Sequence, residues 1–165
     1  MSYLITSGKI KKYIHNVDTS FTKQQLGTSI VGYNGTIVTY TPPANAQNIV
    51  YECSLQFSWN PDTANSYACT RLQYSDDYAG ESNSANWTWN TISNTKVMDG
   101  TSSTVNDYDW FIATYNFLIP TWSGERKLRL AGRAYNSSYE CTLGRAYGNS
   151  EDTASCPHVL VYAIF

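Results

Sequence analysis

Charged residues are scarce in this chain of 165 residues: eleven Lys and Arg and thirteen Asp and Glu make up 15% of it, with a net charge of −2. Proteins that grip a phosphate backbone or an anionic lipid surface carry clusters of Lys and Arg. The composition therefore argues against a nucleic-acid partner. No apolar run approaches a membrane span, and the N-terminal residues lack the apolar core of a signal peptide, so we expect neither membrane insertion nor export by the general secretory route.

Motifs for catalysis and metal binding are also scarce. The chain has two histidines, His15 and His158, and neither lies in a recognisable nucleophile or metal motif. Asp76, Asp77 and Glu81 share one predicted loop and could form a calcium site or a glycosidase pair, which keeps a hydrolase as a third class of function. A solvated group of turn-forming acids is the simpler interpretation. We therefore expect no enzyme activity, no catalytic residues, no metal and no cofactor.

The four cysteines form no Cys-x-x-Cys pair and no zinc-ligand pattern with the two histidines, so a zinc site is poorly supported. Two pairs that are close in sequence, Cys53 with Cys69 and Cys141 with Cys156, could face each other across neighbouring strands and form disulfides. Nothing in the sequence indicates an oxidising compartment, so the preferred interpretation is four reduced, buried thiols.

Helix signals are missing, whereas strand signals recur. No stretch of a dozen residues repeats apolar positions at intervals of three and four, but short runs of β-branched and aromatic residues alternate with turn residues. Such a pattern predicts an antiparallel two-layer sandwich or a barrel. The predicted strands cover residues 10–14, 36–40, 49–59, 67–74, 87–92, 110–119, 127–135, 141–147 and 159–165.

Residues 49–59 give the clearest strand signal. One phase runs from Ile49 to Trp59 and is apolar, and the other phase contains Glu52, Ser54 and Gln56. This period of two predicts a strand with one face in the core and one in water. Two prolines at positions 42–43 come before the strand, and they end the preceding ladder because they have no amide donors.

Residues 110–119 and 159–165 are apolar on both phases, which indicates a second partner on the outer face. A loop of the same chain could provide that cover, but self-association is the preferred interpretation. The predicted interface residues are Trp110, Ile112, Phe117, Val159, Val161 and Phe165.

A long polar segment at residues 75–90 is typical of a binding loop on a β scaffold. Trp87 and Trp89 share one strand phase and could stack against a sugar ring, together with Tyr74 and Tyr78. Core packing of the two tryptophans is the alternative.

A basic stripe follows one predicted strand. Lys127, Arg129 and Arg133 share one face of it. The stripe could grip acidic sugars or a partner's carboxylates. A solvated outer strand face is the simpler interpretation.

The segment "YTPPANAQNIVYE" and the long strand after it resemble small jelly-roll domains of tailed-bacteriophage virion proteins, which look related to trimeric tumour-necrosis-factor-like jelly rolls. The resemblance covers residues 39–59 and implies an all-β, antiparallel two-sheet jelly-roll sandwich of eight to nine strands. It also implies a non-enzymatic homotrimer that is assembled in the host cytoplasm and displayed on the virion surface. There it would be a head decoration protein or a receptor-binding tail-fibre tip, in contact with capsid or tail proteins and in the second case with a host glycan.

The expected organisation is an N-terminal arm or docking segment at residues 1–25 and a jelly-roll domain at residues 26–165. A different class of function stays open beside the virion role. A monomeric carbohydrate-binding module would use the same sandwich and would bind its ligand through Trp87, Trp89, Tyr74 and Tyr78.

Overall fold

The computed structural model describes residues 10–17, 21–59, 67–75, 90–98, 109–134, 141–144 and 155–165, and the regular secondary structure within these ranges consists of β-strands. The strands are, in chain order, β1 (Ile10–Val17), β2 (Gln24–Leu26), β3 (Val31–Gly32), β4 (Val38–Tyr40), β5 (Asn48–Trp59), β6 (Tyr67–Ser75), β7 (Asn90–Met98), β8 (Asp109–Pro120), β9 (Arg126–Ala134), β10 (Cys141–Leu143) and β11 (His158–Ile164).

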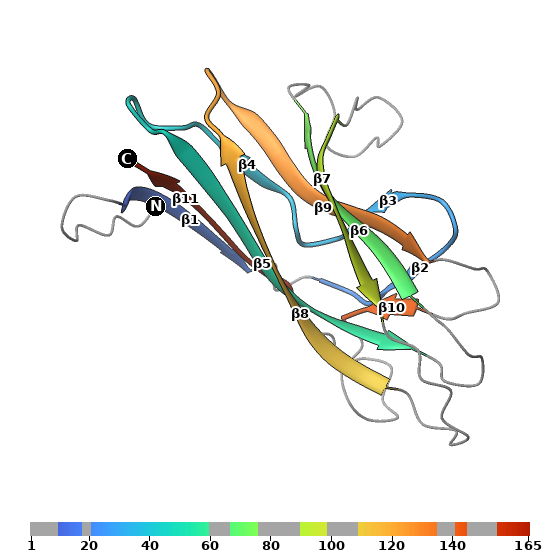
Figure 1. The fold of residues 1–165 in the computed structure, drawn as a ribbon. Helices are drawn as coiled ribbons and strands as arrows, with labels where there is room; N and C mark the ends of the chain where they lie inside the picture. The colour runs from blue at the N-terminus through green and yellow to red at the C-terminus, as the bar shows by residue number, and fades with distance from the viewer. Residues whose placement is uncertain are drawn as a thin grey trace.

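The strands form two antiparallel sheets. Sheet A has six strands, in which β5 lies between β8 on one edge and β11 and β10 on the other, with β1 and β2 outside them. Sheet B has five strands, in which β9 lies between β6 and the short strands β3 and β4, with β7 outside β6. Figure 1 shows the long pair β5 and β8 of sheet A, with β9, β6 and β7 in the other layer. This arrangement confirms the predicted all-β sandwich.

The connections are those of a jelly roll. The chain passes from β4 in sheet B to β5 in sheet A, to β6 and β7 in sheet B, to β8 in sheet A, to β9 in sheet B and finally to β11 in sheet A. The structure has eleven strands instead of eight or nine because three positions of the sandwich are each filled by two short strands: β1 with β2, β3 with β4, and β10 with β11.

Strand β5 has the two faces that its sequence predicts. Tyr51, Cys53 and Phe57 are fully buried in the core, whereas Glu52 and Gln56 on the other face are half-buried. The turn before β5 follows the two prolines and is closed by the amide of Ala46, which donates to the carbonyl of Pro43 at 3.2 Å. The strand therefore begins where the proline pair predicts.

A set of hydroxyl groups joins the two sheets through the core. Thr70 Oγ1 on β6 lies 2.9 Å from the hydroxyl of Tyr33 and accepts a hydrogen bond from Tyr115 on β8 at 3.1 Å. The ring of Tyr33 lies against Gly132, where an added Cβ would come within 2.0 Å of the Tyr33 oxygen. Glycine at this position of β9 therefore leaves the space in which Tyr33 packs.

The N-terminal segment takes part in sheet A. Ile10–Val17 pairs with β11 and Gln24–Leu26 pairs with β10. Between these two strands Phe21 is buried and lies beside Gly144, whose φ is +69° and where a Cβ would meet the Phe21 ring. The boundary between an arm and a domain at residue 25 stays a prediction.

Candidate functional site

The outer face of sheet A carries exposed apolar side chains. On β8 the core-facing residues Tyr115, Phe117 and Ile119 are each at most 6% exposed, and they alternate with outward-facing residues. Of these, Ile112 is 73% exposed and Leu118 is 64% exposed. The outward-facing side of β8 therefore carries two exposed apolar side chains together with the exposed polar residues Thr114 and Asn116.

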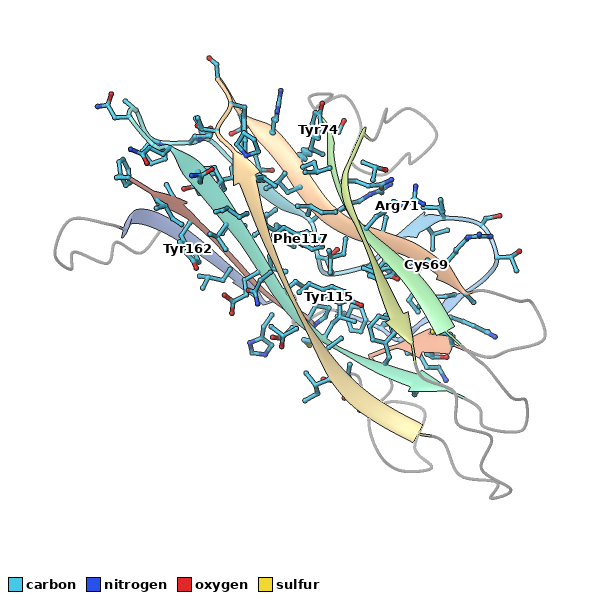
Figure 2. All side chains as sticks on the ribbon, viewed as in Figure 1. Cys69, Arg71, Tyr74, Tyr115, Phe117 and Tyr162 are labelled. Atoms are coloured by element: carbon cyan, nitrogen blue, oxygen red, sulfur yellow. The ribbon has the colours of Figure 1, made fainter. Side chains whose placement is uncertain are left out.

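A line of apolar residues crosses three strands of this outer face. Leu118 of β8 pairs with Val50 of β5, and Val50 pairs with Tyr162 of β11, so the three side chains project from the same face of sheet A. We call Leu118, Val50 and Tyr162 the apolar row. Figure 2 shows Tyr115 and Phe117 between the two layers, whereas Tyr162 lies on the far side of sheet A.

The predicted interface residues differ in how far their side chains are exposed to solvent. Phe117 is buried in the core, where β8 faces sheet B, and Val159 and Val161 are fully buried, so these side chains offer no surface to another chain. Phe165 is half-buried against the same core. The side chain of Trp110 lies outside the described residues, although its backbone is part of β8.

Of the predicted set, Ile112 is the residue whose described side chain is exposed on the outer face. Leu118 belongs beside it and was missing from the prediction. The period of two could have identified Leu118, because it lies six positions from Ile112 and therefore points to the same side of the strand.

The outer face of sheet B is charged, and its cations are held within the chain. Arg129 Nε donates to Gln73 Oε1 at 3.1 Å, and Arg133 donates to the carbonyl of Thr28 at 3.3 Å. Burial lowers the pKa of Arg129 to about 10. Lys127 is only 3% exposed. The basic stripe is therefore not fully solvated: Lys127 is buried, whereas Arg129 and Arg133 are half-buried and hydrogen-bond to other residues of the chain.

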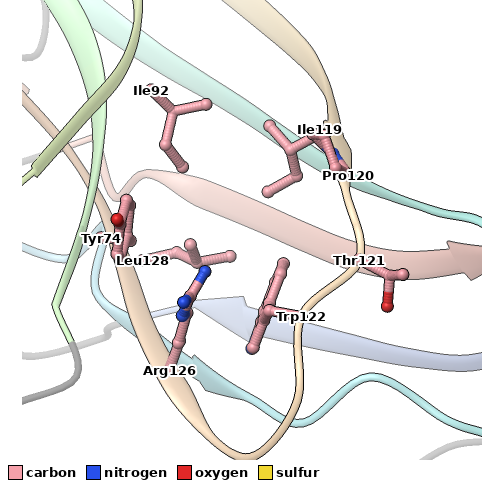
Figure 3. A pocket seen from close by; sticks show the side chains of 8 residues that line it. All are labelled: Tyr74, Ile92, Ile119, Pro120, Thr121, Trp122, Arg126 and Leu128. Carbon is pink, nitrogen blue, oxygen red and sulfur yellow. The ribbon is translucent and has the colours of Figure 1, made fainter.

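A pocket of about 270 Å³ lies near the turn that joins β8 to β9. Its walls come from both sheets, since β8 belongs to sheet A and β6, β7 and β9 belong to sheet B. Figure 3 shows the side chains that surround the space. The lining residues are Tyr74, Ile92, Ile119, Pro120, Thr121, Trp122, Arg126 and Leu128.

Arg126 lies between two aromatic side chains in this pocket. Its guanidinium carbon is 4.5 Å from the centre of the Tyr74 ring and 5.5 Å from that of Trp122. Trp122 also contacts Tyr40 edge to face, with ring centres 6.2 Å apart. The Nε1 atom of Trp122 is buried and has no hydrogen-bond partner among the residues that the structure describes.

Of the four residues predicted to bind a ligand, Tyr74 lines the pocket. Trp87, Trp89 and Tyr78 lie outside the described residues. Sequence reasoning missed Trp122, because it lies in a turn that the pattern marked only as a strand boundary.

The buried thiols and phenols are held in their neutral forms. Burial raises the pKa of Cys53 to about 12 and also raises the pKa of the Cys141 thiol and the Tyr51 hydroxyl. All four cysteines are unpaired thiols, and Cys53 and Cys69 lie on strands of opposite sheets. The preferred interpretation of free thiols is therefore confirmed, and neither alternative pair, Cys53 with Cys69 or Cys141 with Cys156, is bridged. Cys53 and Cys141 are buried as expected, whereas Cys69 and Cys156 are only half-buried.

His158 is exposed at the start of β11. In the part of the chain that the structure describes, no three His, Cys, Asp or Glu residues gather as a metal site would require. Within that same part, no helix is long and apolar enough to cross a membrane.

No family model matches the chain, and no curated protein matches it. Similar solved structures include Eiger TNF from S. frugiperda, with a TM-score of 0.34 and 10% identity over 88% of this chain and 93% of that chain. A pentameric capsid protein from metagenomic phage sequences has a TM-score of 0.28 and 10% identity, over 90% of this chain and 62% of that one. A structure of infectious bursal disease virus, Gx strain, has a TM-score of 0.30 and 12% identity, over 93% of this chain and 36% of that chain. Likeness of this degree carries no argument about function, and the sandwich described above rests on the pairing of its own strands.

Proposed function

We propose that this protein is a non-enzymatic structural protein of a tailed-phage virion, a homotrimeric jelly roll displayed on the particle surface. Its place there is that of a head decoration protein or of a receptor-binding tail-fibre tip, with capsid or tail proteins as its other partners. The observation that carries the proposal is the exposure of two large apolar side chains, Ile112 and Leu118, on the outer face of sheet A.

Self-association follows from the cost of leaving this surface in water. Leu118 and Ile112 are both more than half exposed on β8. Leu118 pairs with Val50, which is buried, and Val50 pairs with Tyr162, which is half-buried. Burial of apolar area is worth about 25 cal/mol per Å². Copies related by a rotation axis form a closed assembly, which is the usual form of a soluble homo-oligomer.

One pair of polar groups on this face is also suited to burial. Ser54 Oγ of β5 and Thr114 Oγ1 of β8 lie 2.9 Å apart and share a hydrogen bond. A second copy that covers this pair would therefore not leave these hydroxyls without a partner, which would otherwise cost about 1–3 kcal/mol for each group.

The titratable groups of the core support a structural role over a catalytic one. A nucleophilic cysteine needs a lowered pKa, whereas burial raises the pKa of both Cys53 and Cys141. The hydroxyls of Tyr33 and Tyr115 are engaged with Thr70 between the sheets. These groups hold the layers together and are closed to a substrate.

The virion role rests on the resemblance of residues 39–59 to phage jelly-roll domains, in which a Thr-Pro turn precedes a long two-faced strand. Immunogold electron microscopy of particles from the source of the sequence tests the role directly. Labelling at regular positions on the head supports the decoration protein, and labelling at fibre tips supports the receptor-binding role. Purified particles without the protein, as judged by both labelling and mass spectrometry, would refute the proposal.

A further inference from the structure

We infer that each contact in the homotrimer joins two different surfaces of the chain: the outer side of β8 on one copy and the edge of sheet B at β3 on the next copy. We call them the β8 surface, formed by Ile112 and Leu118, and the β3 edge, formed by Ile30, Val31 and Ile37. The inference rests on the self-association in the proposed function, and it does not depend on the position of the protein on a particle.

Three-fold symmetry requires a contact of this kind. A two-fold axis brings the same surface of both copies together, whereas in a ring of three one surface of each copy meets a different surface of the next. In the part of the chain that the structure describes, the exposed large apolar side chains fall into two groups, the β8 surface and the β3 edge, and each of them is more than a third exposed. The chain therefore carries the two apolar surfaces that a ring of copies needs.

The two surfaces lie on opposite edges of the sandwich. In the described part of sheet A, β8 is the outermost strand on its side of β5, and it lies near β7 of sheet B. On the other side of the molecule, β3 and β4 lie beyond β9 in sheet B, and β4 lies near β1 of sheet A. Figure 1 accordingly shows β3 well apart from β8. One copy can therefore contact a different neighbour at each edge.

Backbone groups at the β3 edge are already hydrogen-bonded within the chain. The side-chain amide of Gln24 donates to the carbonyl of Gly32 at 2.9 Å, and its oxygen accepts from the backbone N–H of Asn34 at 2.8 Å. The carbonyl of Gly27 accepts from the amide of Ala134 at 2.8 Å. A neighbouring copy that covers this edge would therefore not leave these groups without a partner, and apolar side chains would make the contact.

The two surfaces also match in charge, because neither segment carries any. Residues 27–40 and residues 110–121 contain no Asp, Glu, Lys or Arg. Contact between these segments therefore neither buries an unpaired charge from them nor brings like charges of the two segments together. A strongly charged partner would find no ion pair in either segment. The occupant that suits the β3 edge is therefore the β8 surface of a second copy.

Two complementary variants of the full chain, measured alone and mixed, test the inference. The first combines Ile112→Asp with Leu118→Asp and loses the β8 surface, and the second combines Ile30→Asp with Ile37→Asp and loses the β3 edge. Light scattering after size exclusion should give 18.5 kDa for each variant alone. The mixture should form a dimer, for which two chains of 18.5 kDa give 37.0 kDa, because the β8 surface of the second variant and the β3 edge of the first are intact.

The other results separate this inference from the proposed function. A wild-type mass of 18.5 kDa would refute self-association and this inference with it. A folded β3-edge variant that keeps the wild-type mass of 55.5 kDa would overturn the inference and leave the trimer standing. Two folded, monomeric variants whose mixture stays at 18.5 kDa would also overturn it, because their intact surfaces would then not bind each other.

Two further variants control for charge and for folding. Asn45→Asp adds a negative charge in the exposed turn before β5, outside both surfaces, and should keep the wild-type mass. If the β3-edge variant does not fold, Ile30→Ser combined with Ile37→Ser removes the same apolar groups without adding charge. This variant should raise the concentration at which the chains assemble at least about tenfold. An unchanged assembly concentration would overturn the inference.

Discussion

The outer faces of the two sheets differ in whether their side chains contact other residues of the chain or are exposed to solvent. On sheet B, Arg129 is hydrogen-bonded to Gln73, Arg133 is bonded to a backbone carbonyl, and Lys127 is buried. On sheet A, Ile112 and Leu118 extend into solvent. The basic side chains of sheet B therefore have their partners within the chain, whereas sheet A presents the kind of surface that a second copy covers.

The largest expected effect is a difference in folding stability between substitutions on the two faces of β8. Phe117→Asp places a charge in the core between the sheets and should cost at least about 4 kcal/mol of folding free energy, because it removes a packed ring and buries a carboxylate. Leu118→Asp, one residue along, should change the stability of the single chain by about 0.5 kcal/mol. Urea denaturation measures both values, and a stably folded Phe117→Asp protein would contradict the assignment of faces.

The second prediction concerns the inner face of sheet B. Gly132→Ala brings a Cβ against the Tyr33 hydroxyl and the Cys69 carbonyl, so it should destabilise the fold by about 3 kcal/mol through overpacking. Gly27 has open space around it, which makes Gly27→Ala the matched control. Thermal unfolding of the two variants should give clearly different midpoints, and equal midpoints would argue against the packing of Tyr33 on β9.

The third prediction concerns how the stability of the fold depends on pH through the buried Cys and Tyr side chains between the two sheets. Burial raises the pKa of Cys53 to about 12 from an ordinary value of 9.0 and raises the pKa values of Cys141, Tyr33 and Tyr51. Below pH 9 these groups are neutral in both the folded and the unfolded chain, so their full contribution to stability is present there.

Above pH 9 the unfolded chain loses protons that the folded chain keeps. Stability should therefore fall as the pH rises from 9 through 12, by up to about 1.4 kcal/mol per pH unit for each group. Cys53→Ala should make the decline shallower in denaturation curves measured between pH 8 and 11. An identical slope in wild type and variant would show that Cys53 does not titrate in this way.

The smallest expected effect belongs to the outer face of sheet B. Arg129→Met removes the hydrogen bond to Gln73 and keeps most of the side-chain volume, so it should cost about 1 kcal/mol. Because this face is completed within the chain, the variant should assemble as wild type does. Analytical ultracentrifugation measures the oligomeric state. A variant whose oligomeric state differs from that of wild type would show that the outer face of sheet B takes part in the interface, which contradicts this account.

The sequence predicts the strands well where one phase is polar. In β5, Glu52 and Gln56 mark the outer face, so the buried phase follows from the period of two. In β8 the phase from Phe111 to Ile119 is wholly apolar, whereas the other phase contains Thr114 and Asn116, which mark the outer face. An interface prediction that weighs only the apolar residues of both phases therefore includes Phe117, a core residue, and omits Leu118.

The pocket lies beyond the reach of a sequence pattern for a different reason. Tyr74 pairs with Leu128 of β9, which places Arg126 two residues along the same face of sheet B, and Trp122 comes from the turn before β9. These residues meet only because β6 and β9 pair in this register, which the sequence does not show. The bulge at Ile92 adds a residue to β7 and breaks the alternation from which its orientation would be predicted. Tyr74 could be anticipated as a site residue, whereas its partners could not.

The most direct test of the assembly surface is the solution mass by light scattering after size exclusion, for the wild-type chain and for Ile112→Asp combined with Leu118→Asp. Three chains of 18.5 kDa give 55.5 kDa, which is the mass expected for wild type, and the double variant should remain folded at 18.5 kDa. A wild-type mass of 18.5 kDa, or a double variant that keeps 55.5 kDa, would contradict assembly through the outer face of sheet A.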